Sequence, residues 1–231
     1  PHLRPAGEYV RIPFEGSSFA AILRRPPNVV RAPVVIMCMG LDSAKEEMDS
    51  YESLFLARGM ATLTFDGPGQ GESEYDIPIR GEYETAVKAV VDWLEARSDI
   101  DASRTGLWGV SLGGYYAPRV AAMEKRYAAC VAWGGHFDYH ASWIRRRKEI
   151  ESGGTKVSAP YFHLMWVLGV ADMDAAMTKL RQYNLSGVAE KITCPFLVTH
   201  GAHDTIVPAE YAQLLYNAVG SKNKTIKIFS A

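Results

Sequence analysis

Strand-like and helix-like segments alternate along this chain. Two runs predict strands: residues 33–38, which are apolar without interruption as in a strand buried on both faces of a sheet, and residues 61–65. Between these two runs, residues 44–58 show the apolar spacing of a helix. A second helical pattern covers residues 81–97, and its apolar residues fall on one face. Each predicted strand is thus followed by a predicted helix.

The remaining segments extend the same order in both directions. Residues 9–14 and 19–24 predict a hairpin at the start of the chain. Four more strands and two more helices follow: strands 104–110, 127–133, 195–199 and 225–229, and helices 112–124 and 208–219. Repeated strand–helix units predict an α/β fold in which a mostly parallel central sheet carries helices on both faces.

One long segment, residues 134–191, interrupts this order and far exceeds a usual connection between strands. We expect it to form a helical lid inserted before the late strands, over a core made of residues 1–133 and 192–231. The alternative is a helical insert that packs on the sheet. Its basic run, residues 145–148, is interpreted as a solvated helix face. Candidate substrate-binding residues in the segment are His136, His140, His163 and Trp166.

Charge and composition narrow the function. The 231 residues carry 25 basic and 26 acidic side chains, a balance that argues against nucleic acid or an anionic membrane as partner. The longest clean apolar run, residues 32–41, is too short to cross a bilayer. The cysteines are odd in number and form no CxxC pair, which favours reduced core thiols in a cytoplasmic protein over a disulfide or zinc framework. They are Cys38, Cys130 and Cys194.

The strongest chemical signal is the run 109–114, Gly-Val-Ser-Leu-Gly-Gly, between a predicted strand and a predicted helix. Glycines on both sides of Ser111 allow a sharp strand-to-helix turn that leaves the hydroxyl exposed as a nucleophile. The backbone N–H of Leu112, at the start of the helix, is then placed to donate to an oxyanion.

Two further strand ends carry candidate residues. Asp204 follows the strand 195–199, where the acid of a catalytic triad is needed to orient an imidazole, although a turn or helix N-cap would also explain it. After the strand 33–38, the backbone N–H of Leu41 is a candidate second oxyanion donor. The adjacent Asp42 fits either a substrate contact or a helix N-cap.

The glycine-rich run 65–73, Phe-Asp-Gly-Pro-Gly-Gln-Gly-Glu-Ser, has a different interpretation. It lacks the lysine of a P-loop, and Pro68 has no N–H to offer a phosphate. We therefore interpret it as a tight structural turn at the end of a strand.

Together these motifs resemble the α/β-hydrolase superfamily over essentially the whole chain. The runs 40–47, 58–62 and 65–72, with Trp-Gly-Gly at 133–135, look more narrowly like carbon–carbon bond hydrolases of the 2,6-dihydroxypseudooxynicotine hydrolase type. Fungal pigment-pathway hydrolases that shorten polyketides are close to this subgroup. The resemblance leaves a homodimer open as the oligomeric state.

The resemblance implies a triad in the order Ser–Asp–His, with Ser111 as nucleophile and Asp204 as acid. The histidine should follow the last strand, but no histidine follows His203 in these residues. His200 and His203 lie on the same turn as the acid and are interpreted as structural. We expect the base just past Ala231 and a helical segment before Pro1, so that both ends are trimmed.

The sequence thus predicts a serine hydrolase that needs no metal or organic cofactor. Its expected substrate is a small, aromatic organic molecule, cleaved at a carbon–carbon bond next to a ketone or at an ester-like bond. A general carboxylesterase or thioesterase would use the same triad. A non-catalytic binding protein with a hydrolase fold is the rival from a different functional class.

Overall fold

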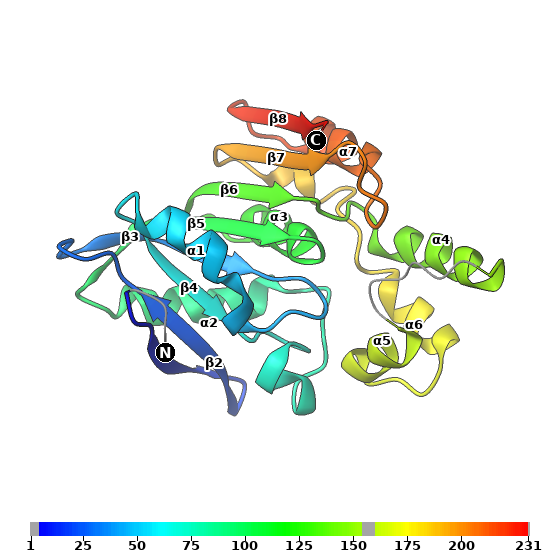
Figure 1. Ribbon diagram of the computed structural model, residues 1–231, viewed down its shortest axis with the longest axis horizontal. Helices are drawn as coiled ribbons and strands as arrows, with labels where there is room; N and C mark the ends of the chain where they lie inside the picture. The colour runs from blue at the N-terminus through cyan, green and yellow to red at the C-terminus, as the bar shows by residue number, and fades with distance from the viewer. Residues whose placement is uncertain (1–4, 154–159, 231) are drawn as a thin grey trace.

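A central eight-stranded sheet organises the fold (Figure 1), seen in a computed structural model that describes residues 5–153 and 160–230. Its strand order is β1-β2-β4-β3-β5-β6-β7-β8. The strands are β1 Glu8–Phe14, β2 Ser17–Arg24, β3 Ala32–Cys38, β4 Ala61–Phe65, β5 Ile100–Val110, β6 Tyr127–Trp133, β7 Phe196–Gly201 and β8 Lys224–Phe229. Each predicted strand is present, and β5 begins four residues earlier than expected.

Strand direction brings the carboxyl ends of the parallel strands to one edge of the sheet. β1 and β2 form the predicted hairpin, and β2 pairs antiparallel with β4. Every other neighbouring pair is parallel, from β4 through β3, β5, β6 and β7 to β8. The carboxyl ends of these strands therefore emerge together, which is where open α/β sheets bind their ligands. The predicted α/β architecture is confirmed.

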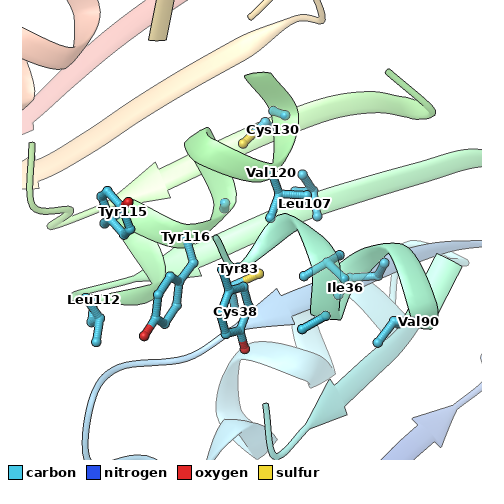
Figure 2. Close-up of a cluster of buried hydrophobic side chains, with 14 of the residues drawn as sticks. Ile36, Cys38, Tyr83, Val90, Leu107, Leu112, Tyr115, Tyr116, Val120 and Cys130 are labelled. Atoms are coloured by element: carbon cyan, nitrogen blue, oxygen red, sulfur yellow. The ribbon is translucent and has the colours of Figure 1, made fainter. Parts of the chain in front are cut away.

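Helices cover both faces of the sheet. Side chains of α2 (Glu84–Glu95), α3 (Gly113–Met123) and α7 (Glu210–Ala218) belong to one large core. Figure 2 shows part of this core, with side chains of α2 and α3 against β3, β5 and β6. A short 3₁₀ helix, η1 (Lys45–Met48), leads into α1 (Asp49–Leu56), which packs on the opposite face.

The sequence of β3 explains how one strand serves both faces. Val34, Ile36 and Cys38 enter the large core, whereas Val35 and Met37 join the smaller cluster under α1. Alternate side chains of a strand point to opposite faces, so a strand covered on both sides is apolar throughout. Full burial of each such side chain contributes about 1.5–3 kcal/mol.

The segment between β6 and β7 is helical. It contains α4 (Tyr139–Glu151), α5 (Tyr161–Leu168), α6 (Met173–Leu180) and the short η3 (Ala189–Lys191). In Figure 1, α4, α5 and α6 lie beyond the carboxyl ends of the parallel strands. Residues 154–159 of the predicted lid lie outside the described residues. A lid function for this segment stays a prediction.

One expectation about this segment is wrong for one residue. The basic run 145–148 was expected to form a solvated helix face, but the Arg146 side chain is buried, with 4% of the residue exposed. Arg145, Arg147 and Lys148 do reach the surface. The run spans four consecutive helix positions, more than one turn, so one of its members falls on the inward face.

The three cysteines are free, as expected; Cys38 and Cys130 are buried and Cys194 is partly buried. Burial raises the pKa of the Cys38 thiol to about 12 and that of Cys130 well above its ordinary value. These two thiols are therefore protonated core side chains. Across the part of the chain that the structure describes, no helix has the length and apolar character needed to traverse a bilayer.

Candidate active site

Ser111 sits in a strained turn between β5 and α3. Its φ angle of 57° lies in the left-handed region that residues with a side chain rarely adopt. The turn also requires glycine on both sides. A Cβ on Gly109 would overlap the backbone of Gly113, and a Cβ on Gly113 would overlap the carbonyl group of Cys38. This close packing supports the backbone in a conformation that lifts the serine out of the strand.

Two backbone N–H groups near the serine are the predicted oxyanion donors. Leu112 is the N-cap of α3, so its N–H belongs to the helix end where the dipole is positive. The loop after β3 passes beside the nucleophile, since a Cβ on Gly40 would lie 3.5 Å from Cβ of Ser111. Leu41 follows directly. Within residues 5–153 and 160–230, neither Leu112 N–H nor Leu41 N–H donates a backbone or side-chain hydrogen bond.

The glycine-rich turn after β4 holds the loop that contains Leu41. The Gln70 side-chain amide donates to the carbonyl oxygen of Gly40 at 2.6 Å and to that of Met39 at 3.2 Å. The hydroxyl of Tyr83 in turn donates to Oε1 of Gln70 at 3.0 Å. All three bonds are buried. Gln70 is therefore a positioning residue that fixes the peptide groups on either side of Gly40.

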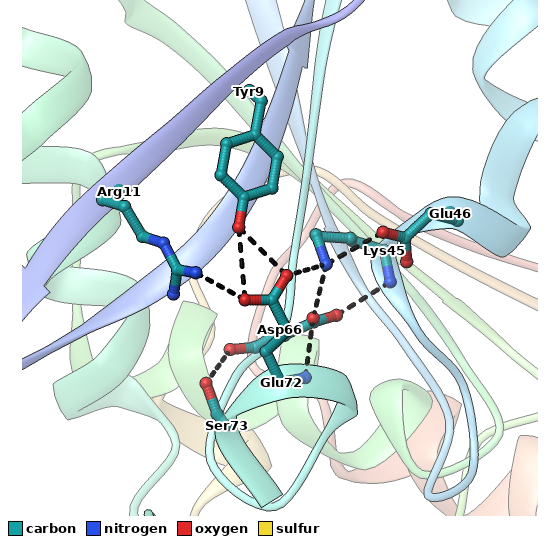
Figure 3. Close-up of polar contacts among 7 residues, drawn as sticks. All are labelled: Tyr9, Arg11, Lys45, Glu46, Asp66, Glu72 and Ser73. Atoms are coloured by element: carbon teal, nitrogen blue, oxygen red, sulfur yellow. Dashed lines mark hydrogen bonds and ion pairs between the residues drawn. The ribbon is translucent and has the colours of Figure 1, made fainter. Parts of the chain in front are cut away.

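A buried ion pair joins the same two loops (Figure 3). Lys45 Nζ lies 2.8 Å from Asp66 Oδ2 and 2.9 Å from Glu72 Oε1. Asp66 also accepts the backbone N–H groups of Lys45 and Glu72, both at 2.9 Å. Tyr9 and Arg11 donate to Glu72 from the edge strand. The predicted structural turn is thus confirmed, and its anchor is Lys45.

Burial and hydrogen bonds shift the pKa values of Lys45 and Glu72 in opposite directions. Burial lowers the pKa of Lys45, but its hydrogen bonds to Asp66, Glu72 and Glu46 outweigh burial and raise it overall. The hydrogen bond from Lys45 is the main reason that the pKa of Glu72 falls to about 2. Both groups are therefore charged at neutral pH.

Asp204 lies at the same edge of the sheet, after β7. Its Oδ1 accepts the backbone N–H groups of Ile206 and Val207, at 2.8 and 2.9 Å. Its Oδ2 faces the end of β6, 3.6 Å from where a Cβ on Gly134 would lie. The turn interpretation of this aspartate therefore explains one oxygen and leaves the other directed toward the strand ends.

The two neighbouring histidines are placed differently. Nε2 of His200 lies 3.7 Å from Asp204 Oδ2, beyond hydrogen-bond range, and 2.9 Å from the carbonyl oxygen of Val207, to which it donates. His200 is buried, while His203 is exposed on the turn. Because its Nε2–H is committed to a backbone carbonyl, His200 serves a structural role in this arrangement.

The other sequence candidates differ in how far they are exposed. Asp42 is exposed, and the N-cap of the following 3₁₀ helix is Ala44, so the N-cap interpretation of Asp42 is wrong. His136 is buried, with Nδ1 2.9 Å from Ser142 Oγ, and burial lowers its pKa well below 6.5, with Arg146, Arg145 and His200 adding to the effect. The partly exposed candidates are His140 on α4 and His163 on α5.

Trp166, the last of the candidates, lies on α5. It is 53% exposed, and its ring packs against Tyr75 at 5.9 Å, where α5 meets the 3₁₀ helix η2 (Gly71–Tyr75). The two rings line a surface groove with Met165. Within the described ranges, no three histidine, cysteine or carboxylate side chains gather as a metal-ligand group.

Known proteins resemble this chain in sequence. Residues 47–230 match the model of the prolyl oligopeptidase family. The chain is 38% identical to 2,6-dihydropseudooxynicotine hydrolase of Paenarthrobacter nicotinovorans, over 95% of this chain and 60% of that protein. It is 30% identical to the hydrolase acrC of Aspergillus aculeatus, over 82% of this chain and 51% of the relative.

The fold comparison gives the same result. The crystal structure of 2,6-dihydroxy-pseudo-oxynicotine hydrolase superimposes with a TM-score of 0.87 and 34% identity, covering 98% of this chain and 61% of the other. The chain therefore has the α/β-hydrolase fold, as its motifs predict. It spans between half and about three fifths of the length of these relatives.

Proposed function

Because the chain belongs to the prolyl oligopeptidase family and has the α/β-hydrolase fold, we propose that it is a serine hydrolase with Ser111 as nucleophile. The observation that carries the proposal is the position of Ser111 on a left-handed turn, with the Gly40 loop passing beside it. Strain of this kind persists where the surrounding structure supports it, and it clusters at active sites.

The first chemical step forms an oxyanion near the N–H groups of Leu112 and Leu41. A histidine removes the proton of Ser111, whose oxygen attacks the substrate carbonyl. The N–H groups of Leu112 and Leu41 donate to the oxyanion that forms. Loss of one such donor typically lowers kcat about 10²–10³-fold. The hydrogen bond from the Gln70 side chain to the carbonyl oxygen of Gly40 holds the peptide group that carries the Leu41 N–H.

The acid and the base of the triad meet at the same edge. Asp204 holds the imidazole in one tautomer through Oδ2, since Oδ1 is occupied by backbone N–H groups. We propose that the histidine comes from residues that follow β8. This strand runs parallel to β7, so the chain that leaves it arrives at the edge that carries Asp204.

The bond that breaks is proposed from the relatives. A protein 38% identical is named as a hydrolase of 2,6-dihydropseudooxynicotine, which favours a small organic substrate for this chain as well. We propose cleavage of a carbon–carbon bond next to a ketone, with an ester-like bond as the alternative. Collapse of the tetrahedral intermediate expels a carbanion that is protonated as it leaves, or an alcohol, and water then releases the acyl group from Ser111.

Paired substrate panels test this proposal in the full-length protein. Aryl esters and aryl β-diketones of matched size are compared for the wild type, Ser111→Ala and Asp204→Asn. We expect Ser111→Ala to lose activity on both panels, and Asp204→Asn to lose about 10⁴-fold in kcat through the wrong histidine tautomer. Turnover that persists in Ser111→Ala would overturn the proposal.

A further inference from the structure

Three consecutive arginines on α4 have different surroundings. Arg145 lies 3.9 Å from Glu149 and donates to the carbonyl oxygen of Ile206. Arg147 pairs with Glu151 at 3.0 Å and with Asp174 at 3.1 Å. Arg146, the most buried of the three, has no carboxylate partner among the residues that the structure describes. A buried charge left without a counter-charge is unfavourable, and a bound anion would relieve it.

The position of Arg146 on α4 defines the direction it faces. Arg145 reaches toward the turn that carries Asp204, and Arg147 reaches toward α6. Successive helix positions are about 100° apart, so Arg146 lies on the arc between these two directions. The other buried positions of α4 share this arc: Tyr139, Ser142 and Trp143. This inward face of α4 therefore lies between the strand-end loops and the other helices of the segment.

Contacts link the inward face of α4 to the catalytic edge. The Arg146 guanidinium stands 5.0 Å above the ring of Trp143, and the ring of Tyr139 lies 6.3 Å from that of Trp143. Tyr139 packs on His136 at 4.7 Å. His136 follows Gly134, the residue that borders Asp204.

Titration behaviour connects the same groups. Burial raises the pKa of Tyr139 to about 12; Arg146 and the Trp143 N–H oppose this rise, and the Asp42 carboxylate adds to it. The charges of Arg146 and Asp42 thus act on the same hydroxyl group.

A second hydrogen-bond donor lies on the same face of α4. The buried indole N–H of Trp143 faces the Tyr139 hydroxyl oxygen but, within the described residues, falls outside the geometry of a full hydrogen bond. The inward face of α4 thus presents a fixed positive charge and, beside it, a weakly engaged N–H donor. Such a set of donors suits a ligand with negatively charged oxygen atoms.

We propose that Arg146 is a specificity-determining residue that binds a carboxylate, or the enolate of a 1,3-dicarbonyl, on the substrate attacked by Ser111. This inference rests on the proposed function, because it assigns the substrate class of the same site. Arg146 supplies a bidentate hydrogen-bonding group for the anion, the ring of Trp143 supports the guanidinium, and the indole N–H offers one more donor.

Acidic and neutral esters of equal length test the assignment. The probes are 4-nitrophenyl hemiesters of dicarboxylic acids from succinate to suberate, each paired with the ester of the neutral acid of the same chain length. The measured quantity is the ratio of kcat/KM for the acidic ester to that for the neutral one. We expect this ratio to fall about 10- to 100-fold in Arg146→Met for the best hemiester.

Two matched variants separate charge recognition from general effects. Arg147→Met removes the neighbouring arginine, whose carboxylate partners lie on the surface, and should leave the ratio unchanged. Arg146→Lys keeps the charge but loses the planar fork, so its ratio should fall between those of the wild type and Arg146→Met. A ratio in Arg146→Met within twofold of the wild type at every chain length would overturn the inference.

A measurement on the wild type covers the case in which Arg146→Met does not fold. A phenylalkanoate anion should inhibit hydrolysis of a neutral ester at least tenfold more strongly than its primary amide. Equal inhibition contradicts the inference.

Binding separates the two proposals. Calorimetric titration of Ser111→Ala with the phenylalkanoate reports anion binding without catalysis. Anion binding that is lost when Arg146→Met is added supports this inference even if Ser111 proves not to be the nucleophile. Ester hydrolysis by Ser111 without any anion preference refutes this inference alone.

Discussion

Replacing Lys45 with methionine should destabilise the protein strongly. Lys45 is 2% exposed and its ammonium group lies between Asp66 and Glu72. Methionine keeps most of the side-chain length but removes the charge. Among the residues that the structure describes, the fully buried Asp66 carboxylate then keeps only its two backbone N–H donors.

The magnitude follows from the uncompensated carboxylate. Removing one partner of a buried ion pair costs about 3–5 kcal/mol. The backbone N–H groups of Lys45 and Glu72 remain as donors to Asp66, so we expect the lower end, about 3 kcal/mol. In the double variant Lys45→Met/Asp66→Asn part of this loss should be recovered, because the buried charge is then absent.

Urea unfolding followed by tryptophan fluorescence measures this loss. The transition should move to lower urea at an unchanged m value. Lys88→Met is the matched control, because Lys88 is 59% exposed and forms a surface pair with Asp92 that is worth about 0.3–0.5 kcal/mol. If Lys45→Met costs no more than Lys88→Met, the buried pair does not hold the two loops together.

Three further predictions concern the same region. Gln70→Leu should lower kcat for an aryl ester about 10²-fold with little change in KM, whereas the surface control Gln213→Leu should change neither; an altered KM alone would contradict a role in holding the oxyanion loop. The pKa of His136 lies well below 6.5, so its contribution to stability is fully present above pH 6.5 and should be lost as pH falls below that value, by up to about 1.4 kcal/mol per pH unit. His136→Asn should therefore show a shallower dependence of stability on pH in urea titrations. The pKa of Glu72 falls from 4.5 to about 2, so its stabilisation should be present above pH 4.5 and lost toward pH 2; the stability difference between wild type and Glu72→Gln should shrink over that interval.

The sequence predicts best what depends on neighbouring residues. The alternation of apolar runs and helical patterns gives the order of strands and helices, and the elbow at Ser111 follows from glycines two positions away on either side. The Leu41 loop and Asp204 are placed by their positions after strands, because parallel strands end at one edge.

Contacts between distant residues are not visible in the same way. Lys45 and Asp66 are 21 positions apart, and Gln70 reaches a carbonyl 30 positions earlier. No local pattern links these residues, although the density of glycine around Gln70 indicates a tight turn. Arg146 illustrates a different error. A run of basic residues predicts an exposed helix face, but the elements that pack around the helix decide which member of the run is buried.

Covalent labelling of Ser111 tests the central claim most directly. The full-length protein is incubated with a fluorophosphonate and examined by intact mass and peptide mapping. We expect one adduct, on the peptide that contains Ser111, and none in Ser111→Ala. An adduct that persists in Ser111→Ala, or the absence of any adduct on a folded wild-type protein, would contradict the assignment of Ser111 as an activated nucleophile.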